Sequence, residues 1–145
     1  MTLIINLAVA AYLAGLFWYL QIVHYPLFTY VDKKSFLEYH IYHLKRNTYI
    51  IFIPMLLEGA FSILFAFDSP HVIPPMIPFL CLCLSTSMWL VTFSHITPLH
   101  DKLTADGLDK DTVDKLIQMN WIRTIGWTVK TLLLIYCVSK MVFLF

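Results

Sequence analysis

The sequence predicts an all-α integral membrane protein, a bundle of four transmembrane helices forming a single domain over residues 1–145. Of the 145 residues, 59% are hydrophobic and 13% are charged, and the mean hydropathy is +0.73. Four apolar stretches reach the roughly 20 residues that a spanning helix needs. This composition excludes a soluble domain of this size. The net charge of +1 gives no support to a nucleic-acid partner, and we expect none.

The four spans are predicted at about 3–24, 48–67, 74–95 and 121–144. No Lys or Arg precedes the first span, so it lacks the charged start of a cleavable signal peptide and should be retained. Basic residues concentrate in the connections after the first and third spans and are absent from the turn at 68–73. Because cytoplasmic loops carry the excess of Lys and Arg, both long connections should face the cytoplasm and both termini should lie outside.

Both long connections are predicted to contain short amphipathic cytoplasmic helices. Ser35 and Glu38 fit a capping box, which would start a helix at about residue 36 that runs into the second span. Asp109 or Asp111 could start a similar helix before the fourth span, after a turn at Gly107.

A weak internal similarity divides the chain into halves. The first span ends in His24-Tyr25-Pro26-Leu27 and the third in His95-Ile96-Thr97-Pro98-Leu99, and an Asn opens the next span in each half, at Asn47 and Asn120. Two parallel-repeat helical hairpins would account for this pattern. The matching segments are short, so chance also accounts for it.

Five of the six histidines should gather at the cytoplasmic end of the bundle. Ionisable side chains at membrane depth are usually functional, so this cluster is the first candidate site. It could be a transition-metal site, with iron or copper as the metal, or a b-type haem site with His24 and His95 as axial ligands. A metal-free catalytic pocket, or histidines that only bind headgroups and tyrosines, remain as alternatives. The predicted metal ligands are His24, His40, His43, His95 and His100.

Other polar side chains share the interior faces of the predicted helices. Glu58 and Lys130 both lie roughly 15 Å from the cytoplasmic interface, near the bilayer midplane, where an ion pair between them is expected and would form the pocket floor. Arg46, Asn120 and Arg123 would orient a substrate at the pocket mouth, although both arginines could instead bind lipid phosphate.

Several short motifs carry a resemblance to known proteins. They are His24-Tyr25-Pro26, Tyr39-His40-x-x-His43, Pro54 with Glu58, and Asn120-Trp121-x-Arg123 ahead of Trp127. The chain resembles small four-helix membrane proteins of bacteria and, more distantly, the anthrone oxygenase-like family. The resemblance implies a bacterial inner-membrane protein that oxidises a lipophilic aromatic substrate such as an anthrone or a hydroquinone, with histidine as base or ligand. The density of Tyr and His exceeds that family's pattern and leaves room for metal chemistry.

The sequence therefore favours a membrane oxidoreductase or oxygenase that acts on a lipophilic aromatic or quinone-like substrate through the histidine-rich site. The alternative is a non-enzymatic small subunit of a larger membrane complex, since 16% of the residues are aromatic and much of the surface would face lipid or a partner. A homo-oligomer is also open. A transporter ranks last, because four helices form a path only as an oligomer.

Overall fold

The computed structural model describes residues 1–142, and every regular element in this range is helical. Four long helical runs are present, each long and apolar enough to cross a membrane, which confirms the all-α class. The predicted end of the fourth span at residue 144 lies outside the described residues. In chain order the elements are α1 (Thr2–Tyr19), η1 (Leu20–His24), α2 (Tyr25–Leu27), η2 (Phe28–Tyr30), α3 (Lys33–Phe67), α4 (Met76–Val91), η3 (Thr92–Ile96), α5 (Thr97–Asp106) and α6 (Lys110–Val142).

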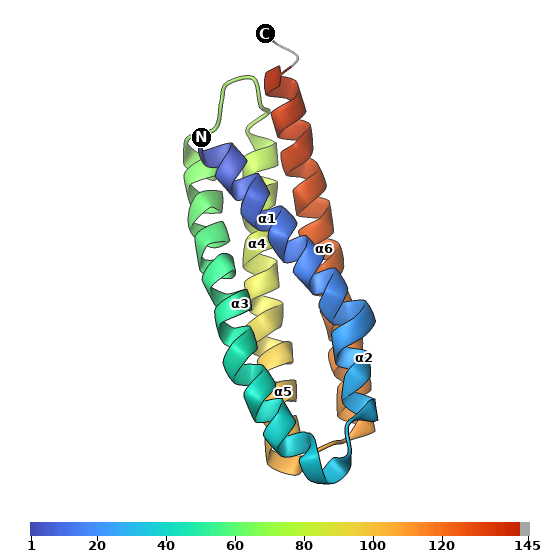
Figure 1. Ribbon diagram of the computed structural model, residues 1–145. Helices are drawn as coiled ribbons and strands as arrows, with labels where there is room; N and C mark the ends of the chain where they lie inside the picture. Colours follow the sequence, from blue (N-terminus) through green and yellow to red (C-terminus); the bar gives the residue numbers. More distant parts are fainter. Residues whose placement is uncertain (143–145) are drawn as a thin grey trace.

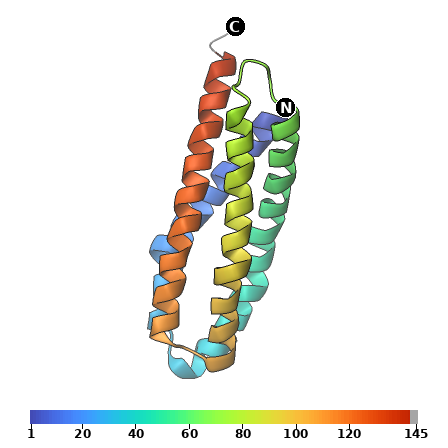
Figure 2. The ribbon, with the colours of Figure 1, turned by 180° about the vertical axis from the view of Figure 1, so that it is seen from behind.

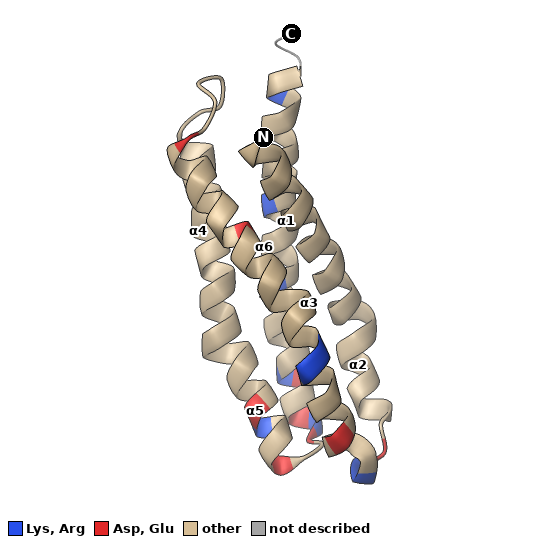
Figure 3. Cartoon of the chain, turned by 60° about the vertical axis from the view of Figure 1, so that its left-hand side comes forward, with Lys and Arg blue, Asp and Glu red and all other residues tan. Residues whose placement is uncertain are grey.

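The four runs close into a ring, in which α1 packs against α3 and α6, and α4 packs against the same two helices (Figure 1). The N-terminus and the end of α6 lie at the same end of the bundle as the turn between α3 and α4. The other two connections lie at the opposite end (Figure 2). Charged residues gather at that opposite end (Figure 3). The bundle is therefore polarised, with an end rich in charge and an end that carries the termini.

The helix starts differ in detail from the prediction. The side chain of Asp32 accepts a hydrogen bond from the backbone N–H of Lys34 at 3.1 Å, so α3 starts at Lys33 and the capping box at Ser35 is wrong. Asp109 caps α6, because its carboxylate accepts from the backbone N–H of Thr112 at 3.2 Å. The hydrogen bond from the Thr112 hydroxyl also lowers the pKa of this carboxyl.

The turn between α5 and α6 is at Gly107, as predicted. Its φ of 79° lies in the left-handed region that a side chain disfavours.

The first predicted cytoplasmic helix runs into the second span, as expected, and the helix before the fourth span is likewise continuous with it. The helix after Asp32 continues without a break through the second span and gives α3 a length of 35 residues, and α6 is continuous over 33 residues. The third run likewise continues past the predicted end at residue 95, through η3 and α5 to Asp106. His40, His43 and His100 therefore lie on helices, which fix their positions relative to one another.

Two turns of π-helix interrupt the first and third runs, each two residues before a proline. In η1 the N–H of Tyr25 bonds to the carbonyl of Leu20, and in η3 the N–H of Thr97 bonds to that of Thr92. Pro26 and Pro98 follow, and a proline ring clashes with the carbonyl four residues earlier in a regular α-helix. The wider turn is consistent with relief of this clash. It adds one residue to the helix, which rotates the side chains beyond it by roughly 100°.

A third proline, Pro54, lies inside α3. Because proline has no N–H, the carbonyl of Ile50 loses its helical partner. The hydroxyl of Tyr12 donates a hydrogen bond to that carbonyl at 3.3 Å, which links α1 to α3.

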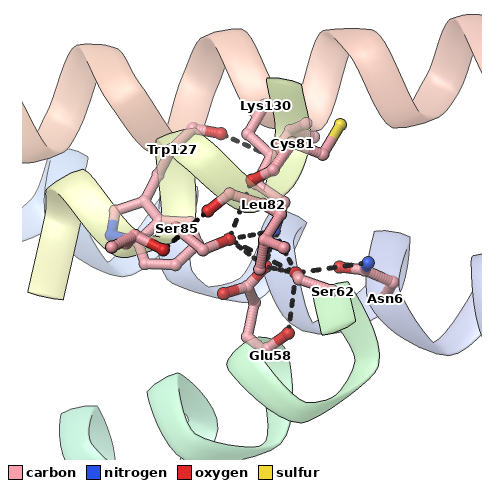
Figure 4. Close-up of polar contacts among 10 residues, drawn as sticks. Asn6, Glu58, Ser62, Cys81, Leu82, Ser85, Trp127 and Lys130 are labelled. Atoms are coloured by element: carbon pink, nitrogen blue, oxygen red, sulfur yellow. Dashed lines mark hydrogen bonds and ion pairs between the residues drawn. The ribbon is translucent and has the colours of Figure 1, made fainter. Parts of the chain in front are cut away.

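A polar network in the middle of the bundle joins all four helical runs (Figure 4). Lys130 on α6 forms the expected ion pair with Glu58 on α3, and both side chains are fully buried. The ammonium of Lys130 also donates to the hydroxyls of Ser62 and Ser85, and Asn6 on α1 donates to Ser62 at 3.4 Å. A buried charge is costly unless it is paired and hydrogen-bonded, so this network fixes the register of the four helices.

Lys130→Met should lower the free energy of unfolding by roughly 3–5 kcal/mol, because it leaves the Glu58 carboxylate buried without its counter-ion. The double variant Glu58→Leu/Lys130→Met should recover most of this loss, since neither charge is then buried. Lys140→Met, at an exposed position on the same helix, is the matched control. Unfolding in one detergent is the measurement. A double variant as unstable as the single variant would contradict the argument.

Candidate functional site: a histidine cluster beside a lateral cavity

Four of the five predicted histidines form one cluster, contributed by η1, α3 and α5. Nε2 of His24 lies 2.6 Å from Nδ1 of His43, and their rings stack with centroids 4.5 Å apart. Nε2 of His40 lies 3.0 Å from Nδ1 of His100. The rings of His43 and His100 are 5.7 Å apart, so the two hydrogen-bonded pairs are neighbours.

An aromatic side chain holds the cluster together. The ring of Phe28, itself fully buried, contacts all four imidazoles, with centroid distances between 5.1 and 6.4 Å. Phe36 stacks on His40 at 5.4 Å. His40, His43 and His100 are buried, whereas His24 is half-buried. His24 is thus the one member of the cluster that reaches the surface.

His95 does not join the other four. It is exposed, and its ring nitrogen contacts the hydroxyl of the preceding Ser94 at 2.7 Å. The prediction placed His95 on the inner face from regular helical spacing, but the extra residue in η3 turns Ile96 inward instead. Relative to the two prolines, the residue that corresponds to His24 is Ile96 and not His95. His24 and His95 are therefore not opposed as axial ligands of a haem would be.

The geometry of the cluster favours proton exchange. Among residues 1–142, no three His, Cys, Asp or Glu side chains are arranged to hold one metal ion. In each histidine pair one ring nitrogen must donate and the other accept, so at least one imidazole of each pair is neutral. Asn47 lies 3.1 Å from Nδ1 of His43, and Thr104 lies 3.2 Å from Nδ1 of His40. The site is therefore a set of coupled proton donors and acceptors.

A cavity of about 160 Å³ opens beside the cluster, between α3 and the run from α4 to α5. Its rim includes the exposed rings of Phe52 and Phe93, and Trp89 and Met55 line its wall. Its polar lining includes the titratable side chains of Tyr25, His43, His100 and Arg123, together with Asn47 and three threonines, Thr48, Thr92 and Thr97. A largely apolar cavity with a few polar groups is typical of a site for a small molecule.

Arg123 is the unusual member of this lining. Its side chain is 1% exposed, and no carboxylate within residues 1–142 forms an ion pair with it. The guanidinium lies over the ring of Phe17 at 4.1 Å and beside the hydroxyl of Tyr25, and its Nε has no hydrogen-bond partner. A buried cation without a counter-ion is unfavourable by several kcal/mol. Its position at the cavity indicates a ligand that supplies a negative or strongly polar oxygen.

The other predicted polar residues lie outside the cavity. Arg46 is exposed and stacks over Tyr42 at 5.2 Å. Asn120 donates to Gln21 at 2.8 Å and so joins α6 to η1. Glu58 and Lys130 do not form the pocket floor, because neither lines the cavity, where Met55 of α3 lies instead.

Two important residues were absent from the predicted site. Tyr25 of the His24-Tyr25-Pro26 motif lines the cavity, and Phe28 contacts all four clustered histidines. Both are buried beyond the π turn of η1. Their signal in the sequence was the proline itself, since a proline deep in an apolar run predicts a local change of register.

Comparisons with protein-family models, with curated proteins and with solved structures find no match to this chain.

His40→Ala should lower the free energy of unfolding by roughly 2–3 kcal/mol, because it leaves the buried nitrogen of His100 unpaired and opens a gap against Phe36. His95→Ala, at the exposed position, should change it by no more than about 0.5 kcal/mol. Equilibrium unfolding of both variants in the same detergent checks the pair. Equal losses in the two variants would contradict the placement of His95 outside the cluster.

Proposed function

We propose that the protein is a membrane oxidoreductase that binds a lipophilic aromatic molecule in the lateral cavity and oxidises it after removing a proton. The observation that carries this proposal is the buried, unpaired Arg123 in the wall of an apolar cavity that two histidines also line. An anionic oxygen of the substrate would supply the missing counter-ion. The neighbouring imidazoles would take the proton that forms this anion.

The proposal places the four helical runs across a bacterial inner membrane, with the charged end in the cytoplasm and both termini outside. The distribution of Lys and Arg supports this orientation. The cavity would then open sideways to the lipid near the cytoplasmic interface. The exposed rings of Phe52 and Phe93 at its rim suit entry of an aromatic molecule from the acyl chains.

The substrate class follows from the lining. Trp89 and Met55 offer apolar contact to a planar ring system, while Arg123 and Tyr25 offer donors to one oxygen. A hydroquinone or an enolisable aromatic ketone has both features. The anion of either compound delocalises charge onto an oxygen, and fixed donors at that oxygen stabilise it most when water is excluded.

The chemistry proposed here begins with proton transfer to His43 or His100. The delocalised anion then passes electrons to dioxygen, which is the oxidant and which dissolves readily in the bilayer. A hydroquinone loses two protons to the histidines and two electrons to dioxygen, and the reduced oxygen takes up two protons from water to form hydrogen peroxide. With an enolisable ketone, one atom of dioxygen becomes the oxygen of a new carbonyl group at the CH₂ carbon. The other atom leaves as water, which balances the two hydrogens lost from that carbon.

Arg123→Gln should lower the rate of hydroquinone oxidation by about 100-fold or more, because loss of one donor to a developing oxyanion has an effect of this size. Arg46→Gln, at an exposed arginine that does not line the cavity, should leave the rate unchanged. Oxygen consumption by the protein in lipid vesicles containing an alkylated hydroquinone is the measurement. An Arg123→Gln variant that is folded and fully active would refute the proposed role of this residue.

Binding can be tested apart from turnover through the tryptophans. A lipophilic quinone should quench the fluorescence of Trp89, which lines the cavity, so Trp89→Phe should remove the largest share of the quenching. Trp121→Phe is the control, since Trp121 packs against Trp18 and away from the cavity. A titration of each variant with the quinone in detergent gives the comparison. Equal quenching in the Trp89→Phe variant and the wild type would place the ligand elsewhere.

A further inference from the structure

The histidine that reaches the surface has no role in the reaction as described. His43 lines the cavity, whereas His24 does not. We infer that His24 carries the proton from His43 to the water at the charged end of the bundle. This inference depends on the proposed function, in which His43 is a proton acceptor, and it assigns the route by which the acceptor is regenerated.

The first argument is the contact between the two rings. Nε2 of His24 and Nδ1 of His43 are 2.6 Å apart, and the rings stack at an interplanar angle of 22°. An imidazole has two nitrogens that exchange roles between donor and acceptor, so it can take a proton on one side and release it on the other. The pair therefore has the geometry of a single proton-transfer step.

The second argument is the change in burial along the pair. His43 is only 6% exposed, whereas His24 is half-buried. Lys45 and Arg46 lie two and three residues after His43 on α3 and are both exposed. Charged side chains at this level indicate that water or headgroups reach it, and a proton on His24 can leave there.

The rings that contact His24 belong to residues without a carboxylate. Its ring neighbours are Tyr19, which is 52% exposed, and the buried Tyr25, Phe28 and His43. Neither of the salt bridges among the described residues involves these groups. A proton that arrives on His24 therefore meets no carboxylate that would retain it.

The second pair does not offer an equivalent exit. His100 also lines the cavity, but its partner His40 is 0% exposed and is covered by the ring of Phe36. The remaining nitrogen of His40 faces the hydroxyl of Thr104, which in turn bonds back to the carbonyl of His100. This branch returns into the bundle, so the branch through His24 is the one assigned.

The test uses a proton carrier to replace the missing side chain. In lipid vesicles and weak buffer, His24→Ala should oxidise an alkylated hydroquinone at about one hundredth of the wild-type rate, the size expected when a proton-transfer group is lost. Added imidazole should restore most of the rate in His24→Ala. It should leave the wild type and the control His95→Ala unchanged. A full rate in His24→Ala without imidazole would overturn the inference.

A structural role of His24 gives a different pattern. His24→Gln keeps a hydrogen-bonding side chain of similar length but cannot relay a proton, so it should fold like the wild type and still need imidazole. If His24→Gln has the wild-type rate in weak buffer, or if imidazole rescues neither variant, His24 is not a proton carrier.

A second readout separates this inference from the proposed oxidation. At a pH below its own pKa, an alkylated hydroxynaphthoquinone should bind at Arg123 as its anion and release a proton, which a pH-indicator dye detects in a rapid-mixing experiment. Release should be fast in the wild type, slow in His24→Ala, and fast again with imidazole. This result supports the relay even if no hydroquinone is oxidised. Equally fast release in all three samples would overturn the relay while leaving the oxidation to be judged by oxygen consumption.

Discussion

The pairing of buried charge distinguishes the structural part of this bundle from its candidate site. Arg123 and Lys130 lie two turns apart on the inner face of α6, and both are almost fully buried. Lys130 meets Glu58 and two serine hydroxyls, so its charge is balanced within the chain. Arg123 lies over the ring of Phe17 and beside the hydroxyl of Tyr25, and no carboxylate among residues 1–142 forms an ion pair with it. Glu58 therefore offsets the cost of burying the Lys130 charge, whereas the proposed ligand would offset the cost of burying the Arg123 charge.

Prolines decide which side chains surround that unbalanced charge. Pro26 and Pro98 each follow a turn of π-helix, and the extra residue directs Tyr25 and Phe28 inward in the first run and Ile96 and His100 inward in the third. Without these turns, regular spacing would continue the inner stripe in a different register. The π turns occur at the site and not elsewhere in the described helices, which fits the general association of such turns with function.

The fold was more predictable from the sequence than the site, for a physical reason. Apolar length identified the four helical runs, and depth alone predicted the pairing of Glu58 with Lys130, because each of these signals is local or depends only on height in the bundle. The sequence also placed four histidines at one end. The prediction that His95 joins this cluster was wrong, because helical spacing assumes 3.6 residues per turn and a π turn breaks that rule. It also treated Arg46 and Arg123 alike, although only packing decides which of them is buried.

The site lies where the proposed reaction could use both the lipid and the water at the charged end of the bundle. The proposed lipophilic substrate would need an opening to the acyl chains, and the cavity between α3 and α4 lies on the side of the bundle. In the proposed reaction the substrate loses a proton to a buried histidine, which needs a path to water to be regenerated, and the charged end of the bundle lies beside the same histidines. Midway along the helices, the buried Lys130–Glu58 pair and the packed interior leave space for neither a substrate nor a path to water. At the level of the histidine cluster, the bundle could therefore bring a lipophilic molecule close to a side chain that exchanges protons with water.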